Sequence, residues 1–182
     1  MMSLPSYFSY HKHGIDVRFV GEDDAEFILS LRTNPELNRF IHATSSDIEN
    51  QRQWIRDYKK REMDGVEYYF IYSKDGPPFC VNRIYGINGD EGTTGSWICA
   101  LKTNPVDVLT TSIVLYYIVF DEIKLRRVLF DTRKDNLSAL KVNRALGGVC
   151  IDETDKDYFF QLIPSKYHAV RNDLIRVWHI KQ

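Results

Sequence analysis

The chain has 182 residues, 43% of them hydrophobic and 13% aromatic, which is enough apolar material for the core of one domain and excludes a disordered composition. Its 24 lysines and arginines balance 25 aspartates and glutamates without a long run of either sign, so the sequence indicates neither nucleic acid nor a membrane surface as a partner. We therefore expect a single domain over residues 1–182 that acts on a small or nucleotide-like molecule.

The first part of the chain is expected to form a strand, two helices and three further strands. Alternating apolar residues predict a strand over 15–20, and the acidic segment EDDAEF begins a helix that ends near Arg32. Ser46 or Asp47 can cap a second helix that runs to about Met63. The segments EYYFIYS, 79–87 and TTGSWICALK then predict three strands joined by tight turns, which form an antiparallel meander.

The second part is expected to alternate helices and strands. A helix beginning near Asp107 is apolar almost all round, which is typical of a helix packed between layers. A strand over 126–131 and a helix over 136–146 follow, then the strand pair VCIDE and DYFFQLI and a tail that forms a short strand or helix. Within 100–148, a strand leads twice into a helix N-terminus, an arrangement that presents backbone N–H groups to a phosphorylated ligand.

The cysteines and the apolar segments bear on location. Cys80, Cys99 and Cys150 lie in separate strand-like runs without CxxC spacing, and we expect buried thiols in a reducing compartment. The longest apolar run, 113–120, is too short to span a bilayer, and the first residues contain no apolar stretch typical of a signal peptide. We expect a cytoplasmic protein and assign no metal site.

The order of elements resembles the GNAT acetyltransferase superfamily over nearly the whole chain, most sharply in the segment FDEIKLRRVLFDTRKDNLSALKVNRALGG over 120–148. This resemblance implies an α/β (α+β) fold with a central mixed, mostly antiparallel sheet of about six to seven strands flanked by about four helices. The segments LRTNPELNRFI, QRQWIRDYKKRE, EYYFIYSKDG and GSWI are similar to the branch that acetylates ribosomal proteins, antibiotics and the nucleotide-linked amino sugars of surface-polysaccharide biosynthesis.

The resemblance implies an N-acetyltransferase that uses acetyl-CoA as co-substrate and transfers its acetyl group to a small amine. A nucleotide-linked amino sugar is the preferred acceptor. A protein N-terminus and an aminoglycoside are alternative acceptors. A catalytically silent GNAT-fold module that binds acyl-CoA or mediates association is an alternative of another class. The sequence does not fix the oligomeric state, which can be a homodimer.

The family binds the pantetheine arm along the strand before the apolar helix and the pyrophosphate at the N-terminus of that helix. The family turn Q/R-x-x-G-x-G/A falls on Thr103, Val106 and Val108, so valines replace both glycines and restrict the loop. Asp107 adds a carboxylate beside the expected pyrophosphate. The implied cofactor-binding residues are Ile98, Cys99, Ala100, Leu101, Thr103, Val106, Val108, Leu109, Thr110, Asn136, Ala139 and Asn143.

Two asparagines in this set have alternative interpretations. Asn136 matches a family position that contacts pantetheine, but asparagine is also a good helix N-cap. Asn143 stands where many members have a tyrosine that protonates the departing thiolate. An amide is not an acid, so the preferred interpretation of Asn143 is a polar residue at the border of the apolar helix face.

The catalytic candidates are His42, Tyr85 and Asp131. His42, in the loop between the first two helices, can take the amine proton near neutral pH or be an ordinary surface residue. Tyr85 alternates with Arg83 on one strand face, so either can line the acceptor cleft, although an arginine on a strand is more often simply solvated. Asp131 ends a strand, where it acts as a base or caps the following turn.

The substrate-binding candidates are Arg32, Trp54, Arg83 and Trp97. Arg32 lies in line with apolar residues of the first helix and needs a partner, either an ion pair or an anionic group such as a nucleotide phosphate or sugar carboxylate. The two tryptophans can stack on a sugar or uracil ring, although aromatic residues at this spacing are usually part of the core.

Overall fold

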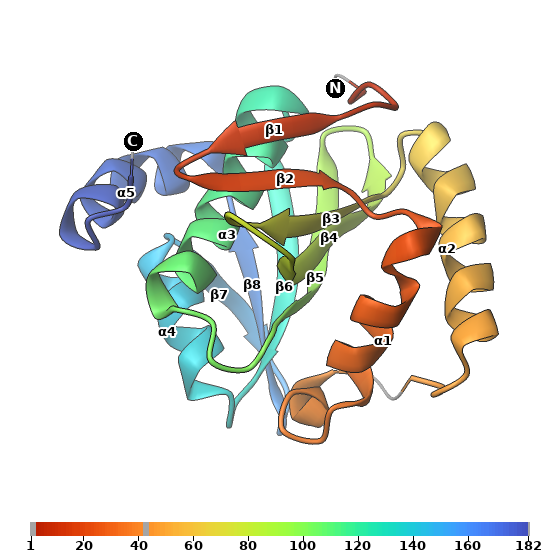
Figure 1. Cartoon of the computed structure of the whole chain (residues 1–182). Coiled ribbons are helices and arrows are strands. Elements are labelled where there is room, and N and C mark those ends of the chain that lie inside the picture. Colours follow the sequence, from red (N-terminus) through yellow and green to blue (C-terminus); the bar gives the residue numbers. More distant parts are fainter. Residues whose placement is uncertain (1–2, 42–43, 182) are drawn as a thin grey trace.

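The computed structural model describes residues 3–41 and 44–181, and its strands form one mixed eight-stranded sheet with the order β1-β2-β3-β4-β5-β6-β8-β7 (Figure 1). Neighbouring strands run antiparallel, except that β5 and β6 are parallel. The strands are β1 (Ser9–Lys12), β2 (Ile15–Phe19), β3 (Tyr68–Ser73), β4 (Pro78–Asn88), β5 (Glu91–Cys99), β6 (Arg127–Arg133), β7 (Val149–Glu153) and β8 (Asp157–Leu162).

Helices cover both faces of the sheet. Within the described ranges the α-helices are α1 (Ala25–Thr33), α2 (Ile48–Met63), α3 (Pro105–Tyr117), α4 (Leu137–Ala145) and α5 (Pro164–Val177). Two 3₁₀ turns lie at Glu22–Asp24 and Asn38–Phe40, and a π-helical turn at Ile118–Glu122 extends α3. None of the described helices is both long and apolar enough to cross a membrane.

Two hydrophobic cores lie on opposite faces of the sheet because strand side chains alternate between them. On β3, Tyr69 and Ile71 pack with Ile28 of α1 and Ile55 of α2. The neighbouring Tyr68, Phe70 and Tyr72 belong to the other core, which includes the buried face of α3 and residues of α4 and α5. Strand β3 is therefore buried on both sides, as its unbroken apolar sequence predicts.

The predicted fold class is confirmed, with differences at both ends of the chain. The sheet has eight strands instead of six to seven, because β1 pairs with β2 at the sheet edge. Its four residues are half exposed and carry little apolar signal. The tail forms a full helix, α5, whose Tyr167 and Ile175 are buried. The predicted cap of α2 is Asp47, whose carboxylate accepts from the Glu49 N–H group.

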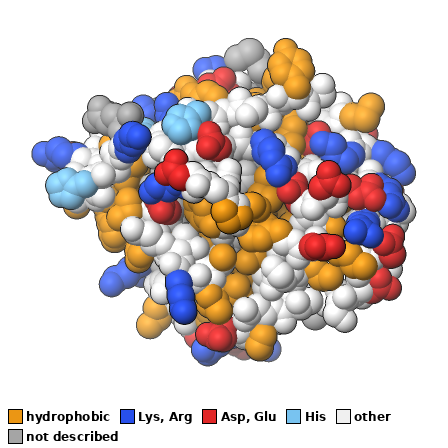
Figure 2. Space-filling model, viewed as in Figure 1, with side chains coloured by type: hydrophobic (Ala, Val, Ile, Leu, Met, Phe, Trp, Pro, Cys, Tyr) orange, Lys and Arg blue, Asp and Glu red, His pale blue; other side chains and the backbone are white. Residues whose placement is uncertain are grey.

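The outer surface of α2 is densely charged, as Figure 2 shows on the right-hand side of the molecule. Ion pairs such as Arg52 with Glu49 and Lys60 with Asp57 are well exposed, and such pairs contribute little to stability. The attachment of α2 to the sheet therefore depends on its inner face.

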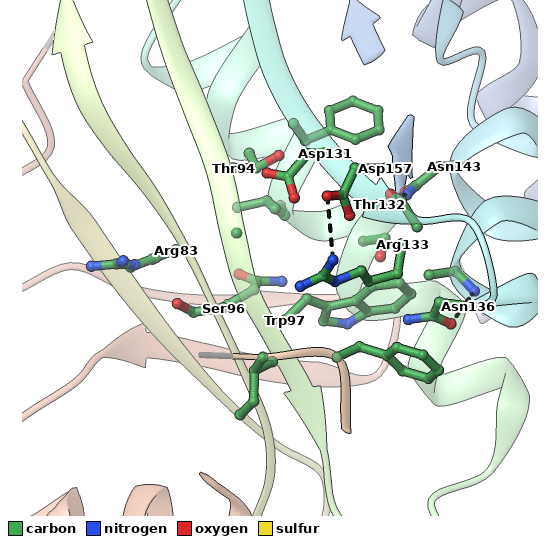
Figure 3. A pocket seen from close by; sticks show the side chains of 18 of the residues that line it. Arg83, Thr94, Ser96, Trp97, Asp131, Thr132, Arg133, Asn136, Asn143 and Asp157 are labelled. Carbon is green, nitrogen blue, oxygen red and sulfur yellow. Dashed lines mark hydrogen bonds and ion pairs between the residues drawn. The ribbon is translucent and has the colours of Figure 1, made fainter. Parts of the chain in front are cut away.

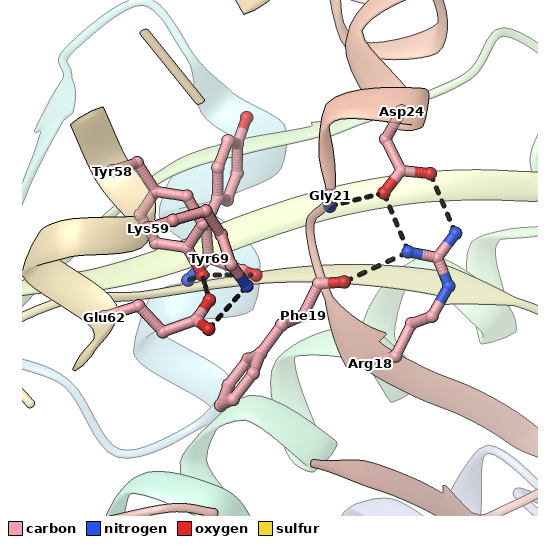
Figure 4. Close-up of polar contacts among 8 residues, drawn as sticks. All are labelled: Arg18, Phe19, Gly21, Asp24, Tyr58, Lys59, Glu62 and Tyr69. Atoms are coloured by element: carbon pink, nitrogen blue, oxygen red, sulfur yellow. Dashed lines mark hydrogen bonds and ion pairs between the residues drawn. The ribbon is translucent and has the colours of Figure 1, made fainter. Parts of the chain in front are cut away.

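A buried polar cluster attaches that inner face to β3 (Figure 4). The Tyr58 hydroxyl donates to the Glu62 carboxylate and accepts a hydrogen bond from the Tyr69 N–H group at 2.9 Å. Lys59 completes the cluster as the ion-pair partner of Glu62. Burial, and then the Glu62 carboxylate, raises the pKa of Tyr58, so its hydroxyl stays protonated.

A second polar contact in Figure 4 fixes the start of the first helical segment. The Asp24 carboxylate accepts from both terminal nitrogens of Arg18, at 2.7 and 2.8 Å, and from the Gly21 N–H group at 2.8 Å. This bidentate contact links the end of β2 to the beginning of α1.

One expectation about the cysteines is wrong. Cys80 and Cys99 face each other on β4 and β5, with 4.0 Å between their Cα atoms, and form a disulfide, while Cys150 is exposed on β7. The pairing is not visible in the sequence because it depends on the register of two strands. It removes the argument for a reducing compartment that was based on free buried thiols.

We predict that Tyr58→Phe lowers the free energy of unfolding by about 1–3 kcal/mol, because it leaves the Glu62 carboxylate and the Tyr69 N–H group buried without their shared partner. Chemical denaturation measures the change. The matched control is Tyr7→Phe, on an exposed tyrosine, which should be neutral. Equal stability of the two variants would contradict the role of the cluster.

Candidate functional site

The sheet opens between its two parallel strands. Only 91–93 of β5 and 127–129 of β6 are paired, and the remaining parts of both strands lie apart. A cavity of about 490 Å³ lies at this opening. Residues from β4, β5, β6, α3, α4 and the segment after α1 line it, so it is bordered by elements from both faces of the sheet.

A β-bulge shapes the wall of the cavity. Val81 pairs with Ile98, and Arg83 with Gly95, so Asn82 of β4 faces two residues of β5, Ser96 and Trp97. Ser96 adopts a left-handed backbone conformation with φ of 51°. A bulge bends its strand and leaves the extra residue outside the ladder, which re-aims side chains beside the cavity.

Arg83 and Tyr85 form one wall on the face of the sheet that α1 and α2 cover. Arg83 donates to Glu67 at 2.9 Å, and its guanidinium carbon lies 4.3 Å from the centre of the Tyr85 ring. Tyr85 packs on Gly95, where a Cβ atom would lie 3.2 Å from the ring. Burial raises the pKa of Tyr85, while the Arg83 charge opposes this shift, so Tyr85 is a protonated phenol at neutral pH.

A smaller cavity of about 230 Å³ adjoins this wall and shares Arg32, Arg83 and Ser96 with the larger one. Trp54 of α2 lines it, with the guanidinium carbons of Arg61 and Arg83 at 5.3 and 5.4 Å from its ring. The Nε atom of Arg32 donates to the Thr44 hydroxyl at 2.7 Å.

The opposite wall is formed by β6 and α4 (Figure 3). Arg83 lies at one end of the view, and Asn143 of α4 and Asn136 at the start of α4 lie at the other. Asn143 donates to the Thr132 hydroxyl at 2.9 Å and so ties α4 to β6. Asn136 accepts from the Ala139 N–H group at 3.1 Å, so it is the N-cap of α4. Arg133 of β6 forms an ion pair with Asp157 of β8, with 3.4 Å between the guanidinium nitrogen and the carboxylate oxygen.

Several polar side chains of the cavity are not among the sequence candidates, and Asn82, Ser112 and Tyr116 are three of them. Tyr116 and Ser112 lie in a helix that is apolar almost all round, and Asn82 lies inside a buried strand, so no amphipathic pattern marks them. Burial raises the pKa of Tyr116 to about 12. Its hydroxyl, 3.5 Å from the Thr94 hydroxyl, is therefore protonated at neutral pH and able to donate a hydrogen bond.

The N-terminus of α3 is less open to an anion than the sequence pattern suggests. Pro105 has no N–H group, and the Asn104 side chain accepts from the Val106 N–H group at 2.9 Å. Asp107 pairs with Lys74 at 2.7 Å. Two of the N–H groups that usually attract phosphate at a helix start are thus missing or occupied.

Only some of the sequence candidates line the two cavities. His42 lies outside the described residues. Trp54 lines the smaller cavity, and the segment 98–110 lines neither cavity; within it Ile98, Leu109 and Thr110 are buried. The candidates that line the larger cavity are Arg32, Arg83, Tyr85, Trp97, Asp131, Asn136, Ala139 and Asn143. No cluster of potential metal ligands occurs among residues 3–41 and 44–181.

Similar folds occur among solved structures. The chain superposes on FdhC, a nucleotide-linked sugar GNAT in its apo form, with a TM-score of 0.83 and 29% identity over 96% of this chain and 99% of that chain. The ribosomal-protein-S5-alanine acetyltransferase from Vibrio fischeri gives a TM-score of 0.77 and 16% identity over 88% and 98% of the two chains. For the spermidine N-acetyltransferase from Vibrio cholerae in complex with CoA and spermine, the values are 0.75, 15%, 86% and 99%. No family model and no curated protein matches the sequence.

We predict that Gly95→Ala lowers the free energy of unfolding by about 1 kcal/mol, because the added methyl group displaces the Tyr85 ring. In a Tyr85→Ala background the same change should cost much less. Thermal denaturation of the four proteins in this double-mutant cycle measures the coupling. As a control, Gly76→Ala places a methyl group no closer than 4.0 Å to its nearest neighbour. Equal costs of Gly95→Ala in both backgrounds would contradict the packing of Tyr85 on Gly95.

Proposed function

Because the chain has the fold of GNAT acetyltransferases, we propose that it is an acetyl-CoA-dependent N-acetyltransferase whose acceptor is the amine of a nucleotide-linked sugar. The observation that carries this proposal is the cavity at the opening between β5 and β6, which is bordered from both sheet faces. Such a cavity can hold two substrates end to end, one entering from each side.

The charges of the cavity support an anionic acceptor. Within the described part of the chain, four arginines and two aspartates line it, namely Arg32, Arg39, Arg83, Arg133, Asp131 and Asp157. Arg133 and Asp157 pair with each other. Arg39 and Arg83 pair with Asp135 and Glu67, two carboxylates outside the cavity lining. The N–H donors that these arginines keep beyond their ion pairs suit a diphosphate group, which arginine binds through planar, bidentate contacts. A protonated polyamine, the acceptor type named for one of the similar structures, has no group that can accept from them.

The smaller cavity suits the nucleotide part of such an acceptor. Arg32 and Arg83 belong to both cavities, so a diphosphate placed at these two arginines leaves the sugar in the larger cavity and the base near Trp54. An aromatic ring can stack on a sugar or base, and here the Trp54 ring is already aligned by Arg61 and Arg83.

When bound, acetyl-CoA supplies the acetyl group as a thioester. The protein's part in transfer is to position the amine and to move two protons. Asp131, exposed at the cavity edge, accepts the proton that the amine releases as its nitrogen bonds to the carbonyl carbon. Tyr116 donates a hydrogen bond to the departing sulfur as the carbon–sulfur bond breaks, and the thiolate then takes its proton from solvent. The amide of Asn143 has no acidic group for this role.

The residues fit the two ends of CoA unequally. The opening between β5 and β6 offers strand edges and polar side chains for the acyl and pantetheine end. At the N-terminus of α3, however, the Asn104 side chain already accepts from the Val106 N–H group, and Asp107 already pairs with the Lys74 ammonium group. Both are donors that a pyrophosphate would use. Lys102 directly precedes this turn, and Lys74 is held by Asp107.

A second candidate function is a catalytically silent module that binds acyl-CoA. The contact of Asn143 with Thr132 and the capped start of α3 favour it, since both replace features that the family uses in catalysis and phosphate binding. Protein N-termini and aminoglycosides remain alternative acceptors for an active enzyme.

We predict that the protein releases CoA from acetyl-CoA fastest with a nucleotide-diphosphate amino sugar, when this acceptor is compared with spermidine, an aminoglycoside and an alanine-starting peptide. A thiol-detecting assay measures the release. Arg83→Gln should raise the acceptor KM about tenfold, because a charge-assisted contact with phosphate is lost. The matched control is Arg56→Gln, whose arginine pairs with Glu22 on the surface. Preference for spermidine would contradict the acceptor class, and binding without turnover would favour the silent module.

We predict that Asp107→Asn tightens CoA binding about two- to tenfold, because it removes a carboxylate near the phosphates and releases Lys74 to contact them. Calorimetric titration measures the affinity, and the gain should shrink at high salt. Pantetheine, which lacks the phosphates, should bind both proteins equally. Weaker CoA binding by the variant would show that the Lys74–Asp107 pair supports the turn in its binding conformation.

A further inference from the structure

One buried amide in the sheet has an unused hydrogen-bond donor. Asn82, in the middle of β4, is 0% exposed, and its Oδ1 atom accepts from the Tyr72 hydroxyl at 2.9 Å. Its Nδ2 atom has no hydrogen-bond partner among the residues that the structure describes. Buried polar side-chain atoms are paired in the large majority of cases, and those that are not often belong to a functional site.

The position of Asn82 indicates which partner is missing. It is the single residue of β4 that faces the bulge of β5 at Ser96 and Trp97, and it lines the larger cavity. It belongs to the same face of β4 as Cys80 and Ile84, which are part of the core beneath α3. The neighbouring Arg83 lies on the other face. Asn82 is thus on the α3 side of the opening, away from the arginines proposed for the acceptor.

We propose that Nδ2 of Asn82 donates a hydrogen bond to the carbonyl oxygen of the acetyl thioester and stabilises the negative charge that this oxygen gains in the reaction. This inference rests on the proposed function. A carbonyl oxygen can only accept hydrogen bonds. It therefore matches Asn82, whose Oδ1 atom already accepts from Tyr72 and whose Nδ2 atom is the group left to donate. The bulge brings the carbonyl and the amide together at the point where β5 leaves the ladder.

The Nδ2 donor acts at the stage at which negative charge develops on the carbonyl oxygen. The amine nitrogen forms a bond to the carbonyl carbon, and the carbonyl π electrons move onto the oxygen that faces Nδ2. When these electrons re-form the carbon–oxygen double bond, the carbon–sulfur bond breaks and the thiolate leaves. Tyr72 holds the amide in place throughout, so the donor needs no reorientation as charge develops, which is the condition for strong electrostatic stabilisation.

The test compares wild-type protein with Tyr72→Phe and with the double variant Tyr72→Phe/Asn82→Leu. The double variant removes both polar partners together and replaces the amide by an apolar side chain of similar size, so the fold should keep or gain thermal stability. Its kcat should fall about 10²- to 10³-fold, the usual effect of removing one donor to the oxyanion. Tyr72→Phe alone keeps the donor and should lose less activity.

A binding measurement makes the test independent of the acceptor. Wild-type protein should bind acetyl-CoA about two- to tenfold more tightly than CoA, and the double variant should bind both equally. Unchanged kcat together with an unchanged acetyl-CoA preference would overturn the inference while leaving the proposed function intact. An equal loss of affinity for CoA and acetyl-CoA would place Asn82 on the pantetheine arm and also overturn it. A wild-type protein that binds neither compound would overturn the proposed function as well.

Discussion

The site depends on how little β5 and β6 are paired. Three residues of each strand form the parallel ladder, and beyond them none of the described strands pairs with both β5 and β6. The split remains open because other contacts hold each side. β4 pairs with β5 along nearly its whole length, β8 pairs with β6, and α3 closes the space beneath. The opening between the two parallel strands thereby becomes a cavity whose two sides are held by separate pairings.

Several buried polar groups lie in or beside the same region. Glu67 is buried between Arg61 and Arg83, and Asn82 is buried beside Tyr72. Each group costs free energy to remove from water and is tolerated where it is paired. These networks aim side chains at the cavity from two faces of the sheet. We infer that the charges at Arg32 and Arg83 select the acceptor, while the uncharged groups on the α3 side contact the acyl donor.

The fold was largely predictable because its long elements are strongly periodic. The aromatic run before Ser73 predicts a strand buried on both sides, and the apolar helix before Tyr117 predicts a helix between layers. The short edge strand β1 carries no such pattern. The cysteine pair was missed because register is a property of two strands, and neither strand's sequence alone records which of its residues face each other.

The site was predictable in part. Arg32 was found because a charged residue in line with the apolar residues of a helix breaks their pattern. Arg83 and Tyr85 were found because polar residues that alternate along a strand share one of its faces. Asn82 and Tyr116 were missed because their elements are buried on both sides, so a polar residue there disturbs no amphipathic period. The glycine-poor turn before α3 was visible in sequence, but the capping by Asn104 and the pairing of Asp107 with Lys74 needed three dimensions.

We infer that the acyl donor binds in the opening between β5 and β6, with its thioester at the bulge. Hydrogen–deuterium exchange of the backbone, with and without acetyl-CoA, measures this directly. On addition of acetyl-CoA, exchange should slow at 95–98 of β5 and 130–133 of β6, with no change in β1 or β7. Protection confined to the second half of α5, where another hollow includes Asn172 and His179, would contradict it.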